Sequence, residues 1–147
     1  MSSTTATIND LIETLKEGQE GFKTAAEEAK SPDLKSLFTE YSNQRAQFAG
    51  QLQELARSFG DPDPADSSSL AGTLHRGWIN FKSAMTGHDD HSILAEAERG
   101  EDVAKEAFAE ALEADLPMGV RETVRMQAEA VFAAHDRVRD LRDGMAH

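Results

Sequence analysis

The sequence predicts an all-α fold, an up-down bundle of five antiparallel helices. Apolar residues recur at alternating spacings of three and four along most of the chain, which is the period of an amphipathic helix. No convincing period-two segment indicates a strand, and short turn-forming stretches separate the helical segments. At 147 residues the chain fits one domain over 1–147, with a core expected at about 8–143.

The first two helices are defined by their stripes and by a turn between them. We expect the first helix from about Ile8 to Lys30, with Thr7 and Asp10 offering an N-cap. A second helix should follow Ser31-Pro32-Asp33, since serine caps a helix and proline is tolerated in its first turn. The inward residues of the first are Ile8, Leu11, Leu15, Gly18, Phe22, Ala25 and Ala29; those of the second are Leu34, Phe38, Tyr41, Arg45, Phe48, Leu52, Leu55 and Phe59.

The remaining three helices follow a connection that proline and glycine interrupt. The segment 60–67 contains two prolines and cannot continue a helix. A third helix is expected from about Ser69 to Thr86, a fourth from about Asp90 to Ala114, and a fifth after Leu116-Pro117 to about Asp143. The inward residues of the last two are Leu94, Ala97, Glu101, Ala104, Phe108 and Ala111, then Val120, Val124, Gln127, Val131, Ala134, Val138 and Leu141.

The charge and composition exclude several classes of function. The chain has 15 Lys and Arg against 27 Asp and Glu, and this net charge of -12 repels phosphate backbones and anionic membrane surfaces. We therefore expect no nucleic-acid and no membrane partner. Without cysteine there is no disulfide, no thiolate metal site and no cysteine nucleophile. No signal segment or long apolar run occurs, so we expect a cytoplasmic protein; an enzymatic activity is left open.

Three polar residues interrupt the apolar stripes. Arg45, Glu101 and Gln127 occupy core positions, where a charge or an amide is costly unless it is paired. Arg45 and Gln127 are therefore predicted to form a structural polar core. Folding the chain at its first turn brings residue 17 level with Arg45, which suggests Glu17 or Glu20 as the neutralising carboxylate.

A His and Glu cluster is predicted by folding the chain at its later turns. His75, Glu98, Glu101 and His135 then lie within about one helical turn of each other, about 5.4 Å in rise. Such side chains could hold iron, manganese or zinc between facing helices. The alternative interpretation is a buried network of His–Glu hydrogen bonds without a metal, and the residue pattern by itself favours this alternative.

Three motifs point to a family: His75-Arg76-Gly77-Trp78, Glu98-Arg99-Gly100-Glu101-Asp102 and the segment from His135 to Arg142. With these motifs the chain resembles a bacterial ferritin-like family of unknown function, domain-of-unknown-function family 2383. The resemblance implies a ferritin-like bundle whose second and third core helices are parallel and joined by a long crossover, which the third predicted helix could supply. It marks His75, Glu98, Glu101 and His135 as motif positions and implies no known reaction.

The expected metal site differs from that of di-iron ferritin-like proteins, in which two core helices each supply Glu-x-x-His. Here Phe132 stands three residues before His135, and the second helix contains no histidine. A mononuclear or vestigial site is easier to build. The first hypothesis is a ferritin-like metal-binding protein of stress response or metal handling. The second is a non-catalytic structural or interaction bundle without metal; in either case the expected partner is a second copy, as in a homodimer.

Overall fold

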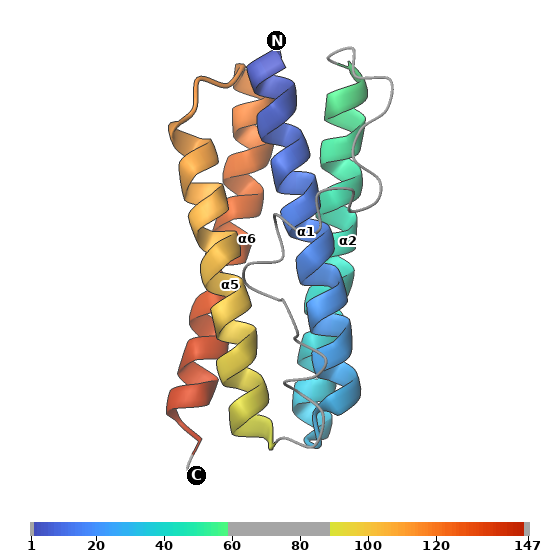
Figure 1. The fold of residues 1–147 in the computed structure, drawn as a ribbon, viewed down its shortest axis with the longest axis vertical. Coiled ribbons are helices and arrows are strands. Elements are labelled where there is room, and N and C mark those ends of the chain that lie inside the picture. The colour runs from blue at the N-terminus through green and yellow to red at the C-terminus, as the bar shows by residue number, and fades with distance from the viewer. Residues whose placement is uncertain (1, 59–88, 146–147) are drawn as a thin grey trace.

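The computed structural model describes residues 2–58 and 89–145, and these residues form four helices (Figure 1). The helices are α1 (Ser2–Glu28), α2 (Pro32–Ser58), α5 (Asp90–Glu113) and α6 (Met118–Asp143). No strand occurs in this part of the chain, so the all-α prediction is confirmed there. The helix expected at about 69–86 lies outside the described residues, and the predicted count of five is not confirmed.

The described helices run in the directions that the predicted order implies for them. α1 and α2 are antiparallel, as are α5 and α6, but α2 and α5 run in the same direction (Figure 1). The carboxylate of Asp90 accepts the backbone N–H groups of Lys30 and Ser31 at 2.8 and 3.0 Å, so α5 begins beside the α1–α2 turn. α2 and α5 are not successive in the predicted order, because the helix expected at about 69–86 comes between them. Alternating directions therefore make α2 and α5 parallel, and α2 ends and α5 begins at opposite ends of the bundle.

The predicted helix ends agree with the structure except at the start of α1. The expected N-cap near Thr7 is wrong, because α1 already begins at Ser2. Thr4 is 5% exposed and extends the buried stripe by one turn. At α2 the backbone N–H of Leu34 donates to the Ser31 hydroxyl at 3.4 Å, as expected of a serine cap.

Side chains also close the two ends of α5. The carboxylate of Asp89 accepts the N–H of Ser92 at 2.9 Å and caps the first turn. At the other end the Arg121 guanidinium donates to the carbonyl oxygens of Leu112 and Ala114, both at 2.7 Å. These donors satisfy carbonyls that the helix itself leaves without partners, so the α5–α6 turn is held tightly.

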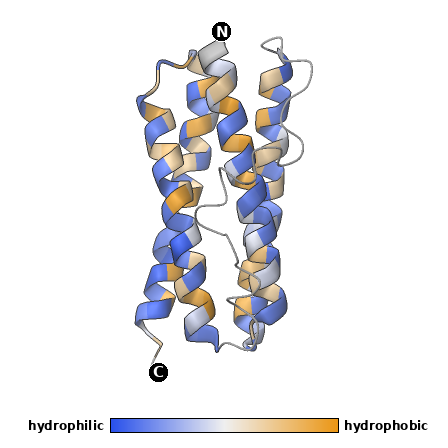
Figure 2. Cartoon of the chain, viewed as in Figure 1, coloured by the Kyte–Doolittle hydropathy of each residue, from blue (hydrophilic) through white to orange (hydrophobic). Residues whose placement is uncertain are grey.

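The predicted stripes of α1, α5 and α6 are confirmed as the buried faces of these helices, except that Leu141 of α6 is only half-buried. In α2 the buried face is rotated from the predicted one. Ser42, Ala49 and Ala56 are buried there, while Phe48 and Leu55 are only partly buried. Figure 2 shows polar and apolar residues interleaved along all four helices. None of the described helices has the length and apolar character needed to cross a membrane.

A polar layer divides the core into two apolar clusters. One cluster lies near the start of α1 and includes Leu15, Ala49, Ala104 and Val131; the other includes Phe22, Phe38, Ala97 and Val138. Between them, at the level of the Arg45 side chain, each helix contributes a buried residue that has no apolar side chain. These are Gly18, Arg45, Glu101 and His135, which we call the polar layer, and all four are buried.

Candidate metal centre

The centre of the polar layer is a buried ion pair between Arg45 of α2 and Glu101 of α5. Both side chains are 0% exposed, and two hydrogen bonds join them, from Nη1 to Oε2 at 2.7 Å and from Nη2 to Oε1 at 2.6 Å. α2 and α5 are diagonal helices whose backbones do not touch, so the pair spans the middle of the bundle. This parallel, two-bond geometry is the strongest form of an arginine–carboxylate contact.

The neighbours of Arg45 explain how its side chain fits the core. A Cβ atom at Gly18 of α1 would lie 3.1 Å from Nη1 of Arg45, so a larger residue would crowd the guanidinium. One turn further along α1, the ring centroid of Phe22 lies 5.2 Å from Cζ of Arg45, a cation–π distance. The Phe22 ring also stacks on Phe38, at 5.8 Å between centroids. A glycine and an aromatic ring of α1 thus both lie against the charge.

The structure pairs Arg45 with a carboxylate that the sequence did not indicate. Sequence reasoning offered Glu17 or Glu20, whereas Arg45 binds Glu101 and the Glu20 side chain is exposed. The predicted height of Arg45 along the bundle, beside residue 17, is correct, since Gly18 lies directly against Arg45. Folding at turns fixes the height of a residue along the bundle, but the packing of the helices decides which neighbour it faces.

Gln127 supplies a second polar contact within the core. Its side chain is 0% exposed, and Nε2 donates to the backbone carbonyl of Phe48 at 3.2 Å and to Oε1 of Gln51 at 2.9 Å. Both acceptors belong to α2, so this amide links α6 to α2. Gln127 and Arg45 thus both have polar partners, whereas Oε1 of Gln127 is buried without a hydrogen bond.

Tyr41, which packs on Phe22 at 5.3 Å between ring centroids, offers a test of this core. Burial raises the pKa of its hydroxyl above the ordinary 10.0, the charge of Glu101 adds to this, and Arg137 and Arg45 oppose it. We expect the native protein to ionise its single tyrosine at higher pH than the urea-unfolded chain. The contribution of neutral Tyr41 to the stability of the fold is complete below pH 10.0. It is lost as the pH rises through the pKa that Tyr41 has in the folded protein. Ultraviolet difference absorbance measures this titration; identical curves for both states would contradict the expectation.

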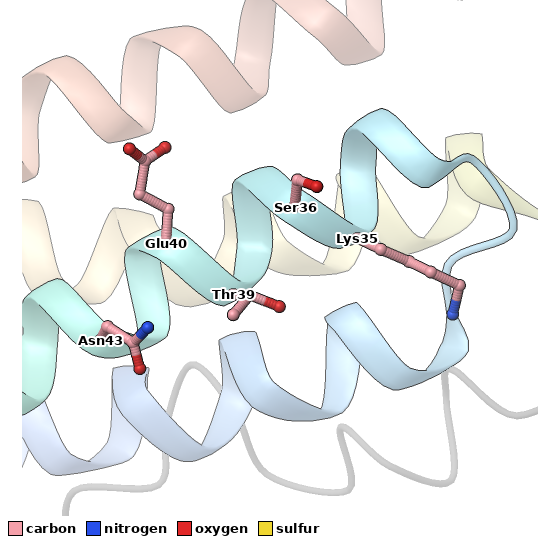
Figure 3. A pocket seen from close by; sticks show the side chains of 5 residues that line it. All are labelled: Lys35, Ser36, Thr39, Glu40 and Asn43. Atoms are coloured by element: carbon pink, nitrogen blue, oxygen red, sulfur yellow. The ribbon is translucent and has the colours of Figure 1, made fainter.

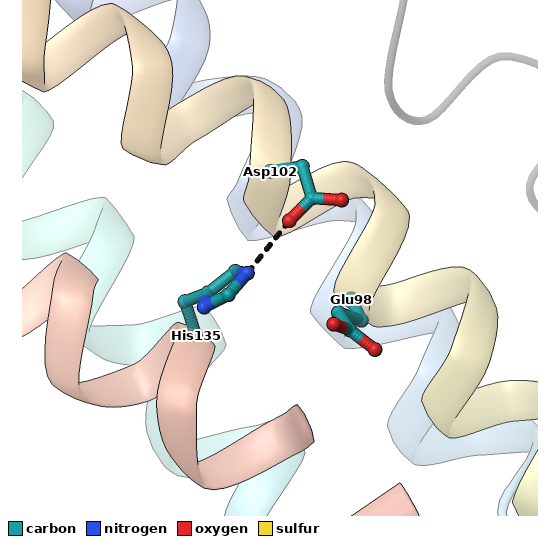
Figure 4. A group of neighbouring side chains, drawn as sticks. All are labelled: Glu98, Asp102 and His135. Carbon is teal, nitrogen blue, oxygen red and sulfur yellow. Dashed lines mark hydrogen bonds and ion pairs between the residues drawn. The ribbon is translucent and has the colours of Figure 1, made fainter. Parts of the chain in front are cut away.

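Three side chains offer metal-ligand atoms to one point where α5 packs against α6, a place that we call the seam. Glu98, Asp102 and His135 each place one such atom so that all three lie within 4.8 Å of one another (Figure 4). Glu98 and Asp102 are one helical turn apart on α5 and therefore share a face, and His135 approaches from α6. The His135 side chain is 7% exposed, that of Glu98 13% and that of Asp102 61%. The group is therefore open to solvent on the Asp102 side.

Carboxylates flank both ring nitrogens of His135. Nε2 lies 2.6 Å from Oδ1 of Asp102, and Nδ1 lies 3.1 Å from Oδ1 of Asp136. The hydrogen bond from His135 is the main cause that lowers the pKa of the Asp136 carboxyl below its ordinary value. A carboxylate on one nitrogen fixes the ring so that the other can face a metal, a common arrangement around metal-binding histidines.

The third member of the group, Glu98, contacts a cation. Oε1 of Glu98 forms an ion pair with Nη1 of Arg142 from α6. That oxygen is buried and makes no hydrogen bond, so the contact is a charge–charge interaction without hydrogen-bond geometry. Arg142 also donates to Oδ1 of Asp143 at 2.7 Å, and this hydrogen bond is the main cause that raises its pKa.

The structure brings together two of the four predicted metal ligands. Glu98 and His135 meet at the seam, whereas both oxygens of Glu101 are bound to Arg45, and His75 lies outside the described residues. Asp102 takes part although sequence reasoning did not select it. The signal was its spacing of four from Glu98, which puts the two carboxylates on one helical face. Glu101, at a spacing of three, points to the bundle centre instead.

A hollow on the outer surface of α2 is a weaker candidate. Its lining residues all come from that one helix: Lys35, Ser36, Thr39, Glu40 and Asn43 (Figure 3). The Lys35 ammonium donates to the backbone carbonyls of Ala26 and Glu27 at 3.1 and 3.2 Å, so it closes the end of α1. Among residues 2–58 and 89–145, no second element contributes a lining residue to this hollow. The seam is therefore the site with convergent chemistry in the described part of the chain.

Comparison with known proteins assigns the chain to a family. A family model described as Domain of unknown function (DUF2383) matches residues 3–114. The chain belongs to this family. The match to DUF2383 covers α1, α2 and α5, including Arg45, Glu98, Glu101 and Asp102, and ends before α6 and His135. No curated protein matches the sequence.

Proposed function

We propose that this DUF2383 protein is a ferritin-like bundle that binds one divalent transition-metal ion between α5 and α6. The observation that carries the proposal is the convergence of Glu98, Asp102 and His135, whose ligand atoms lie within 4.8 Å of one another. One imidazole nitrogen with two carboxylate oxygens suits iron(II), manganese(II) or zinc(II). The parallel course of α2 and α5 supports the ferritin-like arrangement.

The geometry of the group is compatible with one ion after a small adjustment. Nitrogen and oxygen ligands lie about 2.0–2.2 Å from such a metal, so ligand atoms on opposite sides are about 4.4 Å apart at most. The exposed side chain of Asp102 has room to move by the few tenths of an ångström required. Binding would replace the His135–Asp102 hydrogen bond with two metal–ligand bonds, while Asp136 continues to orient the ring. Water molecules would occupy the remaining coordination positions of the ion. A site that is open to solvent in this way suits metal handling.

Metal analysis of tag-free protein tests the proposal. We expect one zinc, manganese or iron ion per chain, and titration calorimetry should show that His135→Ala weakens binding by about 100-fold or more, because a direct ligand is lost. His91→Ala is the matched control, since it removes a histidine of α5 that does not belong to the group. Absence of binding, or equal affinity in wild-type protein and His135→Ala, would refute a metal site at the seam.

The second candidate is a non-catalytic structural bundle, and the Arg45–Glu101 pair favours it. This guanidinium already neutralises the carboxylate at the bundle centre, where a buried negative charge would otherwise attract a cation. On this hypothesis the polar layer fixes the register of the helices and no metal binds. The same metal analysis separates the two candidates, because a folded protein that takes up none of the three ions supports the structural role.

A further inference from the structure

We propose that Arg142 is a built-in competitor of the metal ion, which holds Glu98 in the metal-free protein and has to release it when an ion binds. This inference rests on the proposed metal site and describes its regulation. Arg142 follows His135 by seven residues on α6, so both side chains project from the same face of that helix toward α5. The guanidinium therefore approaches the ligand group from within the seam.

The contact between Arg142 and Glu98 occupies the carboxylate of one candidate ligand. Nη1 of Arg142 contacts Oε1 of Glu98, and this buried oxygen belongs to the carboxylate of the candidate ligand group. The carboxylate is already neutralised by the guanidinium, so an incoming cation gains less from it. An incoming ion therefore has to replace one direct contact between a guanidinium and a carboxylate.

A second acceptor is in place for Arg142 when it leaves Glu98. Nη2 and Nε of Arg142 donate to Oδ1 of Asp143 at 2.7 and 3.2 Å. The Arg142 side chain is 32% exposed and that of Asp143 is 58% exposed, so the pair can turn toward solvent together. Displacement therefore costs one ion pair and leaves no charge buried without a partner. The exchange at Glu98 is a direct competition between a monovalent and a divalent cation.

Removal of the competing charge should tighten metal binding. A unit charge about 5 Å from a divalent ion weakens binding by roughly tenfold even at the dielectric constant of water. We expect Arg142→Gln to bind zinc about tenfold more tightly than wild-type protein in titration calorimetry. Arg142→Lys, which keeps the charge, should stay within about threefold of wild type. The advantage of Arg142→Gln should shrink as salt is added, because salt screens the interaction.

Arg125→Gln is the matched control, because it removes the same charge from the same helix. Arg125 pairs with Glu122 and Glu129 on the α6 surface, ten residues before His135, so zinc affinity should stay within about threefold of wild type. Equal or weaker zinc binding in Arg142→Gln, with wild-type protein still binding zinc, overturns the competition and leaves the metal site standing. If neither wild-type protein nor Arg142→Gln binds zinc, manganese or iron, the proposed function itself fails.

Discussion

Replacing Arg45 by methionine should lower the free energy of unfolding by about 3–5 kcal/mol. The substitution leaves the carboxylate of Glu101 fully buried without its guanidinium partner, and removal of one member of a buried ion pair has this cost. Typical domains are stable by about 5–15 kcal/mol, so the change uses a large part of the total. Urea denaturation followed by circular dichroism measures the difference, provided that the slope of the transition is unchanged.

Two further variants show whether the loss at Arg45 comes from the unpaired charge. The double variant Arg45→Met with Glu101→Leu should regain most of the lost stability, because no charge then remains buried. Arg57→Met removes an exposed arginine that pairs with Glu54, and it should change stability by less than about 1 kcal/mol. A double variant as unstable as Arg45→Met alone would show that packing, rather than charge, controls this site.

Replacing Phe22 by alanine should lower the free energy of unfolding by a similar amount, about 3–5 kcal/mol. The ring is 0% exposed and packs on Phe38 and Tyr41, so its removal loses apolar burial and leaves a cavity. Phe108→Ala is the matched control. This residue is equally buried, but it belongs to the other apolar cluster. Thermal or urea unfolding of both variants gives the comparison.

The two phenylalanines should differ in their coupling to Arg45. The Phe22 ring lies 5.2 Å from the guanidinium carbon, so Phe22→Ala and Arg45→Met should be non-additive by about 0.5 kcal/mol or more. Phe108→Ala combined with Arg45→Met should be additive to within about 0.5 kcal/mol. Additivity in both double variants would mean that Phe22 contributes through burial alone and does not stabilise the charge of Arg45.

Neighbouring acidic residues of α5 make two different kinds of contact. Glu101 points to the bundle centre, where Arg45 neutralises it, while Glu98 and Asp102 face α6 at the solvent-accessible seam. His135 belongs to the polar layer and also to the seam. A metal ion at the seam would thus lie beside a core whose charges are already balanced. For this reason metal binding and core stability should be separable by mutation.

The sequence by itself determined the helical class, most of the helix ends and the buried stripes of α1, α5 and α6. It also identified Arg45, Glu101 and Gln127 as polar residues that need partners, since charged and amide side chains at apolar-stripe positions are costly. The height of each residue along the bundle followed from the positions of the turns. Glu98 and His135, which were expected at the same height, do lie close together. These features depend on the local helical period and on chain length between turns.

Only the tertiary structure decided which side chains meet. Successive helical residues are about 100° apart, so a small rotation of α5 determines whether Glu101 or Asp102 faces His135. Such rotations, and the diagonal contact between Arg45 and Glu101, result from the packing of all the helices together. The position of the start of α5 beside the α1–α2 turn likewise depends on contacts remote in sequence, those of Asp90 with Lys30 and Ser31. A helical period carries no information about these distant contacts, because it describes one helix at a time.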